Sequence, residues 1–251
     1  MGCTILPLII RALLGKPAAR RDARYQILAA VAKRWDFRLY HRDATWFRDI
    51  EFTKVIRAFP GGGGYTAKRY NLYYLARGAA NIIGDTAECG VATGITSFLI
   101  CFAMQHQPNV HYAFDSFEGL PEPEAVDKTE SNVRSLTKGD FAVSLERVRQ
   151  NLHMFSNVQF YKGWIPDRFV EVMDRKFSFV HIDVDFYQST LDSLSFFYPR
   201  LVSGGIMVCD DYGYLGTPGA TQALEEFLLD KPEALIKLAA GHAFIIKSKD
   251  E

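Results

Sequence analysis

The stretch FVHIDVDFYQSTLDSLSFFYPRLVSGGIMVCDDY, from Phe179 to Tyr212, decides the fold of this chain. It contains two apolar, strand-like runs, and each run ends in a pair of carboxylates. Asp183 and Asp185 follow the first run, and Asp210 and Asp211 follow the second, with a helix-length segment and a Gly-Gly stop between them. In an open α/β sheet, ligands bind at the carboxyl ends of the strands. The pattern therefore predicts that the four aspartates meet in one cleft.

Four neighbouring carboxylates repel one another unless a positive group lies between them. An all-oxygen ligand set suits a hard divalent cation such as Mg²⁺, so we interpret the cluster as a metal site. The alternative is that these aspartates are separate turn residues and helix caps at the surface, which are common at strand ends.

Beyond residue 81 the chain alternates between strand-like and helix-like segments, which predicts an α/β fold with a mostly parallel, doubly wound sheet. The expected strands are Thr86–Cys89, Val110–Phe114, Val158–Tyr161, Phe177–Ile182, Ile206–Cys209 and Ala243–Lys247. The expected helices are Thr66–Arg77 with Thr66 as N-cap, Gly94–Gln105, Asp140–Leu152 with Asp140 as cap, Pro166–Met173, Ser189–Leu201 and Ala220–Leu229.

Composition narrows the class of protein. The 251 residues are 48% hydrophobic, which is enough for a full core, and 29 Lys and Arg balance 29 Asp and Glu. No global field favours nucleic acid, so no nucleic-acid partner is expected. The four cysteines are scattered without a CxxC pair, which predicts a reducing, cytoplasmic location.

The N-terminal region, residues 1–64, is expected to be a helical arm apart from a main domain at residues 65–251. Its first apolar segment is too short to span a bilayer, so no transmembrane segment is expected. Apolar residues recur there at helical spacing, namely Leu6, Ile9, Ile10, Leu13 and Leu14. This spacing favours a docking or dimer-packing helix in a homo-oligomer, and interfacial membrane anchoring remains the alternative. The run Gly61–Gly64 reads either as a linker or as the hinge of a lid.

A second constellation is the turn ECGVATG, from Glu88 to Gly94. Gly90 allows a ligand to approach the backbone, and Gly94 allows the next helix to pack closely. Asp115 ends the following strand, where a Rossmann-like fold places the acid that binds ribose hydroxyls. The spacing is not GxGxxG, so a diphosphate is not the expected ligand. An ordinary strand-to-helix turn is the alternative.

Four blocks of sequence together resemble one family. They are ECGVATG, FDSFEGLP at 114–121, IDVDFYQST at 182–190, and GG followed by DDYG at 210–213. From about residue 66 onward the chain is similar to the macrocin O-methyltransferase family of bacterial S-adenosylmethionine-dependent sugar methyltransferases. The resemblance implies a Rossmann-like class I methyltransferase fold with a seven-stranded sheet, a final antiparallel strand and a bound Mg²⁺ ion. The pair Ala92-Thr93 departs from the bulky or basic pair usual in the family.

The resemblance also implies site residues. The metal ligands would be Asp183, Asp210 and Asp211, with Asp185 as a candidate base. The S-adenosylmethionine site would comprise Thr66, Glu88, Gly90, Gly94, Thr96, Asp115, Ser116 and Trp164. His242 precedes the last expected strand and is a second candidate base.

We therefore expect an enzyme that transfers a methyl group to a small-molecule acceptor, a sugar or glycoside hydroxyl presented as a vicinal diol. A metal orients such a diol and lowers its pKa, and a carboxylate then takes the proton. A catechol-like phenol offers adjacent oxygens too and is the alternative acceptor. A binding protein that retains the cofactor cleft is a non-enzymatic alternative.

A different enzyme class is suggested by the series His181, Asp183 and His242. An H-x-D…H set can hold iron in Fe(II) oxygenases. The strand–helix alternation argues against it, because that set normally sits on a β-sandwich. We expect His181 to be a hydrogen-bonded core histidine.

Overall fold

The computed structural model describes residues 5–35, 46, 49–64, 66–129 and 134–249. It separates into two compact units, Met1–Thr53 and Lys54–Glu251. Each unit is described by itself. Among the described residues, no helix is both long and apolar enough to cross a membrane.

The first unit contains a helical hairpin. Helix α1 (Ile5–Leu14) packs against α2 (Pro17–Ala32), which continues into the short 3₁₀ helix η1 (Lys33–Trp35). Small side chains, Ala12 and Ala23, are buried in the hairpin, and Arg24 Nε donates to the Ala12 carbonyl at 3.1 Å. Helix α3 (Ile50–Ala58) runs from this unit into the second. Part of the helical arm expected at residues 1–64 lies outside the described residues.

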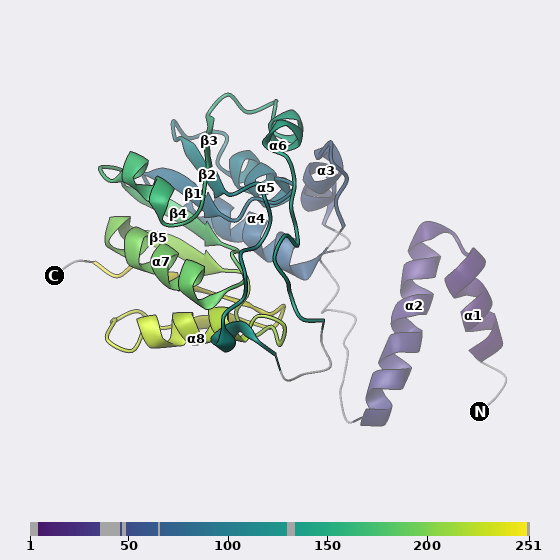
Figure 1. Cartoon of the computed structure of the whole chain (residues 1–251). Coiled ribbons are helices and arrows are strands. Elements are labelled where there is room, and N and C mark those ends of the chain that lie inside the picture. Colours follow the sequence, from purple (N-terminus) through teal and green to yellow (C-terminus); the bar gives the residue numbers. More distant parts are fainter. Residues whose placement is uncertain (1–4, 36–45, 47–48, 65, 130–133, 250–251) are drawn as a thin grey trace. The chain divides into compact units, whose positions relative to one another are not determined.

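The second unit is built on a seven-stranded sheet in the order β3-β2-β1-β4-β5-β7-β6 (Figure 1). The five strands β1 to β5 are parallel, β7 runs antiparallel to β5, and β6 is antiparallel to β7. The mostly parallel sheet and the antiparallel final strand are thereby confirmed. The strands are β1 (Asp85–Cys89), β2 (His111–Asp115), β3 (Val158–Lys162), β4 (Phe177–Ile182), β5 (Leu201–Cys209), β6 (Ile236–Leu238) and β7 (His242–Ile246).

Helices cover both faces of the sheet, as Figure 1 shows. On one face, α4 (Ala67–Ala79) and α5 (Ile95–Ala103) bury a core that includes Leu72, Ile100 and Phe179. On the other face, α7 (Tyr187–Phe197) and α8 (Pro218–Phe227) bury a larger core that includes Phe114 and Phe197. The remaining helices are α6 (Leu145–Asn151) and the 3₁₀ helices η3 (Ala125–Asp127), η4 (Asp167–Val172) and η5 (Tyr198–Arg200).

Strand residues alternate between the two cores, as the pleat requires. On β5, Val208 packs into the α4–α5 core, whereas Met207 and Cys209 pack into the α7–α8 core. Both faces are covered, so the central strands β1 and β4 are buried at nearly every position rather than at alternating ones. The carboxyl ends of β1, β2, β4 and β5 consequently meet at one edge of the sheet.

Three local predictions are corrected. The helix expected from Asp140 begins at Leu145 instead, because Ser144 caps it by accepting from Arg147 N. The helix expected to end at a Gly-Gly stop ends at Phe197, and the two glycines lie inside β5, where the register with β4 shifts. The segment expected as a helix at 166–173 is a 3₁₀ helix, and β6 was not among the expected strands.

Candidate active site

A cavity of about 480 Å³ opens at the carboxyl edge of the sheet. Its walls come from segments far apart in the sequence: the start of α4, the turn after β1, and the ends of β2, β4 and β5. Residues predicted for the site that line it are Thr66, Gly90, Thr96, Asp115, Ser116, Trp164, Asp183, Asp185 and Asp210. A ligand of nucleoside size fits such a volume.

The turn after β1 is held closely against the end of β4. Gly90 has φ +83°, and a Cβ there would lie 1.8 Å from the Asp183 carbonyl oxygen. Only glycine fits at this position. Asp115 orders the same turn, because its Oδ2 accepts from Val91 N at 2.7 Å and from Ala92 N at 3.0 Å. The sequence predicted Asp115 as a ligand-binding residue. It did not predict that the Asp115 carboxylate also holds the backbone of the turn after β1.

Of the other residues predicted for the S-adenosylmethionine site, Thr66 lines the cavity, whereas Gly94 and Glu88 do not. Thr66 is the N-cap of α4 as predicted, accepting from Arg69 N at 3.2 Å. Gly94 does not line the cavity; it begins α5 at φ +83°, where a Cβ would contact Val148 at 3.1 Å. Glu88 is fully buried beneath the cavity, because its carboxylate is bound by His181 and Ser97.

Three carboxylates meet at one end of the cavity, where Asp183 and Asp210 line its wall and Asp211 is buried outside the lining. Asp183, Asp210 and Asp211 each offer an oxygen, and these oxygens lie within 4.8 Å of one another. Asp185 lies beside them, with φ +61°, and its backbone N–H donates to Asp211 Oδ2 at 2.9 Å. This all-carboxylate set fits a hard divalent cation such as Mg²⁺.

The electrostatics of the cluster indicate strong mutual repulsion. Burial, together with Asp210 and Asp211, raises the pKa of Asp183 well above its usual range. Burial and the same two neighbours, Asp211 first, raise the pKa of Asp185 to about 8. Burial and Asp210 raise the pKa of Asp211 to about 6. A cation among these oxygens would relieve the repulsion that favours protonation.

Asp210 differs because two cationic groups contact it. Lys68 Nζ donates to Asp210 Oδ2 at 2.8 Å and to its carbonyl oxygen at 2.6 Å. His181 Nε2 lies 3.6 Å from Asp210 Oδ1. Burial would raise the pKa of Asp210, but His181 and Lys68 outweigh it and hold the pKa below the usual range. Asp210 is therefore the member of the cluster that remains ionised most readily.

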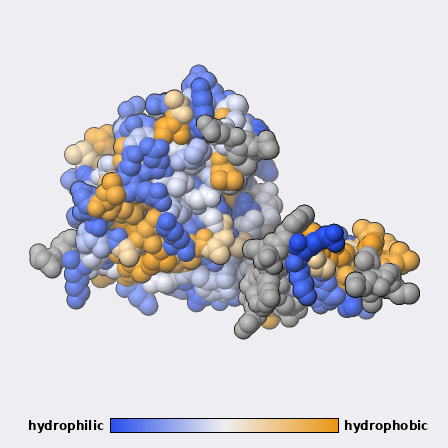
Figure 2. All heavy atoms as spheres, turned by 90° about the horizontal axis from the view of Figure 1, so that it is seen from below, coloured by the Kyte–Doolittle hydropathy of each residue, from blue (hydrophilic) through white to orange (hydrophobic). Residues whose placement is uncertain are grey.

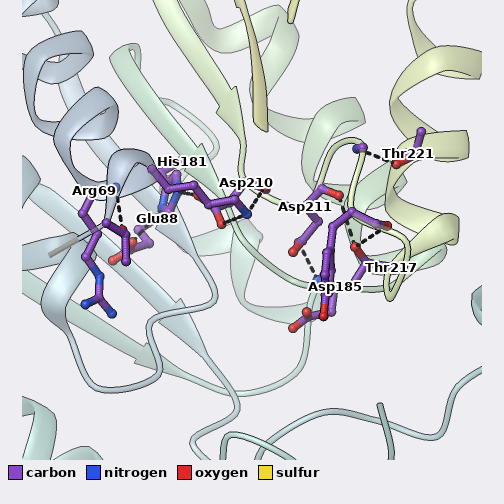
Figure 3. Close-up of polar contacts among 12 residues, drawn as sticks. Arg69, Glu88, His181, Asp185, Asp210, Asp211, Thr217 and Thr221 are labelled. Atoms are coloured by element: carbon purple, nitrogen blue, oxygen red, sulfur yellow. Dashed lines mark hydrogen bonds and ion pairs between the residues drawn. The ribbon is translucent and has the colours of Figure 1, made fainter. Parts of the chain in front are cut away.

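A buried polar network extends from Asp210 into the core (Figure 3). His181 Nδ1 lies 2.8 Å from Glu88 Oε1, and Ser97 Oγ donates to the other oxygen of Glu88. His111 continues the network, with Nε2 3.1 Å from Ser97 Oγ and Nδ1 2.8 Å from Thr86 Oγ1. The prediction that His181 is a hydrogen-bonded core histidine is confirmed.

His242 lies outside the cavity lining. It is 1% exposed on β7, and neither ring nitrogen has a hydrogen-bond partner among the described residues. Burial lowers its pKa to about 4. Neither His242 nor His181 belongs to the oxygen cluster around Asp183, so the ligand arrangement expected of an Fe(II) oxygenase does not form.

Sequence reasoning missed two cationic residues of the cavity, Lys68 and Arg69. Both lie in the first turn of α4, and Arg69 Nη1 donates to the Gly64 carbonyl at 2.8 Å. Lys68 is 142 residues from its partner Asp210, and nothing near Lys68 in the sequence marks it. Gly63 of the glycine run packs near α5, since a Cβ there would lie 2.7 Å from Ile95 Cδ1.

Comparison with known proteins agrees with this architecture. Residues 76–233 match the family model described as macrocin-O-methyltransferase (TylF). The chain belongs to this family. Its fold is also that of solved methyltransferases: the O-methyltransferase NovP has 23% identity and a TM-score of 0.59, covering 72% of this chain and 80% of NovP. Calicheamicin methyltransferase CalS11 has 17% identity and a TM-score of 0.61, covering 92% and 93%.

Two curated relatives share sequence over part of the chain. One is 8-demethyl-8-(2,3-dimethoxy-alpha-L-rhamnosyl)-tetracenomycin-C 4'-O-methyltransferase of Streptomyces olivaceus, 33% identical over 143 residues, 53% of this chain and 55% of that protein. The other is demethyldecarbamoylnovobiocin O-methyltransferase of Streptomyces niveus, 29% identical over 156 residues, 59% of each. The chain thus spans a little over half the length of these relatives.

Proposed function

We propose that this protein is an S-adenosylmethionine-dependent, Mg²⁺-assisted O-methyltransferase acting on a sugar or glycoside that presents a vicinal diol. The observation that carries the proposal is one cavity that joins a glycine turn ordered by Asp115 to the oxygen cluster of Asp183, Asp210 and Asp211. A nucleoside donor and a metal-bound acceptor require these two features side by side. The name of the first curated relative, a rhamnosyl-tetracenomycin-C 4'-O-methyltransferase, supports the choice of a glycoside acceptor.

The donor would lie along the turn after β1. Gly90 would give it close access to the backbone, while Asp115 and Ser116, which line the cavity, would bind its ribose. Thr66 and Trp164 would contact its methionine and adenine ends. S-adenosylmethionine supplies an electrophilic methyl group on a sulfonium, so the protein has mainly to align donor and nucleophile.

The acceptor would lie at the carboxylate end of the cavity. Asp183, Asp210 and Asp211 would hold the Mg²⁺ ion, which when bound orients a diol and lowers its pKa. Asp185 lines the cavity beside them and would take the proton from the acceptor hydroxyl. Lys68 would keep Asp210 ionised and in place through its two hydrogen bonds.

We further propose that residues 1–64 form an arm and that residues 65–251 form the catalytic domain. The reaction takes place in the reducing cytoplasm, in keeping with the buried free thiols of Cys89, Cys101 and Cys209. We propose no nucleic-acid partner, because acidic residues outnumber basic ones along the wall of the cavity, which does not favour an anionic polymer.

A methyl-transfer assay tests the proposal. The full chain is incubated with S-adenosylmethionine bearing a labelled methyl group and with glycosides that differ in having or lacking a vicinal diol. We expect transfer to the diol glycosides only, lost with EDTA and restored by Mg²⁺. Full turnover in the presence of chelator would contradict the metal role, and preferred transfer to catechols would contradict the sugar acceptor.

A further inference from the structure

Helix α1 displays an apolar stripe that its hairpin leaves exposed. Five side chains at spacings of three and four residues form it, with exposed fractions from 40% to 82%: Leu6, Ile9, Ile10, Leu13 and Leu14. Residues at this spacing share one face of a helix. Soluble monomers rarely leave a contiguous apolar surface of this kind without a binding role.

The opposite side of α1 is the one that packs. Ala12 is buried in the hairpin, and its carbonyl accepts from Arg24 of α2. The exposed stripe is therefore not the surface that joins α1 to α2. Helix α2 adds two more exposed apolar residues, Leu28 at 60% and Val31 at 45%.

The charge of the same segment is strongly one-sided. Residues 1–35 contain one acidic residue, Asp22, and seven basic ones: Arg11, Lys16, Arg20, Arg21, Arg24, Lys33 and Arg34. Since the whole chain has 29 residues of each sign, the rest of the sequence carries a matching acidic excess. Figure 2 shows the hydrophobic side chains gathered together on the hairpin, next to hydrophilic ones.

From this combination we propose that the hairpin, residues 5–35, binds the surface of an anionic lipid bilayer. The apolar stripe of α1 would enter the boundary between headgroups and acyl chains, and the basic residues would contact the lipid phosphates. Ten helical residues extend only about 15 Å, half of a hydrocarbon core, so the helix would lie in the interface rather than span it.

The basic charge and the apolar stripe together favour an anionic bilayer over a second copy of the hairpin and over a nucleic acid. A second copy of the hairpin would bring one basic surface against another, which repels. A nucleic acid would match the charge but would leave the five apolar side chains without a role, because phosphate contacts dominate its affinity. An anionic bilayer satisfies both the stripe and the charge, and the inference stands whether or not the proposed methyl transfer is correct.

Vesicle binding by the full chain tests the proposal. Sedimentation with vesicles of phosphatidylcholine and phosphatidylglycerol is compared with phosphatidylcholine alone. We expect binding to the anionic vesicles, weakened by added salt. The double variant Leu13→Gln and Leu14→Gln should lower partitioning by at least roughly tenfold. Arg11→Gln and Lys16→Gln should each lower it by about fivefold.

The matched control is Ile83→Gln, at an apolar residue between α4 and β1 that is more exposed (90%) than Leu13 or Leu14. This variant should bind vesicles as the parent chain does. Equal binding to neutral and anionic vesicles, or no binding at low salt, would overturn the proposal. It would also fail if the leucine variant bound anionic vesicles normally. The leucine variant could instead leave vesicle binding unchanged and either convert a dimer to a monomer or melt at a lower temperature than Ile83→Gln. Either result would overturn the proposal and assign the apolar stripe to a protein contact.

Discussion

Asp185 and Asp183 lie two residues apart at the end of β4, yet their surroundings differ, in keeping with the different roles that we propose for them. Asp183 shares its oxygen cluster with Asp210 and Asp211, as a metal ligand would. Asp185 is outside that set and faces the cavity, while its backbone N–H holds Asp211. A side chain in this place can act on the acceptor without being tied to the ion.

Replacing each aspartate should therefore give a different kinetic defect. Asp185→Asn keeps the shape and should lower turnover by about 10²–10⁴-fold, the contribution of a positioned base, with Mg²⁺ and donor affinities nearly unchanged. Asp183→Asn should raise the Mg²⁺ requirement as well. Turnover measured against Mg²⁺ concentration, with calorimetry for the affinities, separates the two. Near-normal turnover of Asp185→Asn at neutral pH would remove the base role.

His181 is the residue that connects the cavity to the core. Burial alone would lower its pKa, but the Asp210 carboxylate 3.6 Å from Nε2 and the Glu88 carboxylate hydrogen-bonded to Nδ1 outweigh burial and raise the pKa to about 10. A pKa this high favours a cationic ring between the two carboxylates at neutral pH. Removing one member of a buried ion pair leaves the other charge without compensation.

His181→Ala should accordingly destabilise the fold by about 3 kcal/mol or more. Chemical denaturation of the full chain measures this. The control is His153→Ala, an exposed histidine whose Nδ1 lies 2.8 Å from the Gln150 carbonyl, and it should change stability by only about 0.5 kcal/mol. Equal stability of the two variants would show that the Glu88–His181 contact is not structurally important.

At the scale of elements, the carboxylate of Glu233 connects the segment before β5 to the segment after β7 through hydrogen bonds. Glu233 accepts from Tyr198 Oη at 2.5 Å, from Ser248 Oγ at 2.7 Å and from Ser248 N at 3.1 Å, and Lys247 Nζ lies 3.4 Å away. Burial would raise the pKa of Glu233, but these hydrogen bonds lower it from 4.5 to about 2. The segments around β5 and β7 are joined through this group.

This depressed pKa predicts a pH dependence of stability. The ionised Glu233 stabilises the fold fully above pH 4.5, and this contribution is lost as the pH falls from 4.5 towards 2. Denaturation curves are measured at several pH values between 4.5 and 2. The free energy of unfolding should change much less with pH for Glu233→Gln than for the parent chain. Glu146→Gln, at an exposed glutamate, should keep the parent profile. The same dependence of unfolding free energy on pH in the parent chain, Glu233→Gln and Glu146→Gln would contradict this role of Glu233.

The strands that the sequence predicted well are those that the fold buries along nearly their whole length. Strands β1, β2 and β4 match their expected ranges closely, although buried polar residues such as Thr86, Glu88 and His181 stand within these runs. The three-residue β6 has two exposed residues and no such signal. The glycines in β5 looked like a stop because their position in a register shift depends on β4, not on neighbouring residues.

The candidate site was predictable to the same degree. Residues at strand ends, such as Asp183 and Asp210, were found because topology alone gathers them. Lys68 was not found, since it reaches the site from a helix before the first strand. Glu88 was predicted as a cofactor-binding residue from its place in the motif. In the structure its side chain is instead buried in the core and hydrogen-bonded to His181.

The molecule as a whole combines two units with different surface character. The unit Lys54–Glu251 holds the cavity and both cores, and the N-terminal hairpin carries a basic charge and an exposed apolar stripe. These two parts correspond to two separate proposals, methyl transfer by the larger unit and bilayer binding by the hairpin. Each can fail without the other.

Donor binding is the measurement that tests the central claim most directly, because it needs no knowledge of the acceptor. The full chain is titrated by calorimetry with S-adenosylhomocysteine and, separately, with NAD. We predict binding of S-adenosylhomocysteine at one site, no comparable binding of NAD, and weaker binding by Asp115→Ala, by about 1–3 kcal/mol. Binding of NAD with no response to S-adenosylhomocysteine would contradict the account.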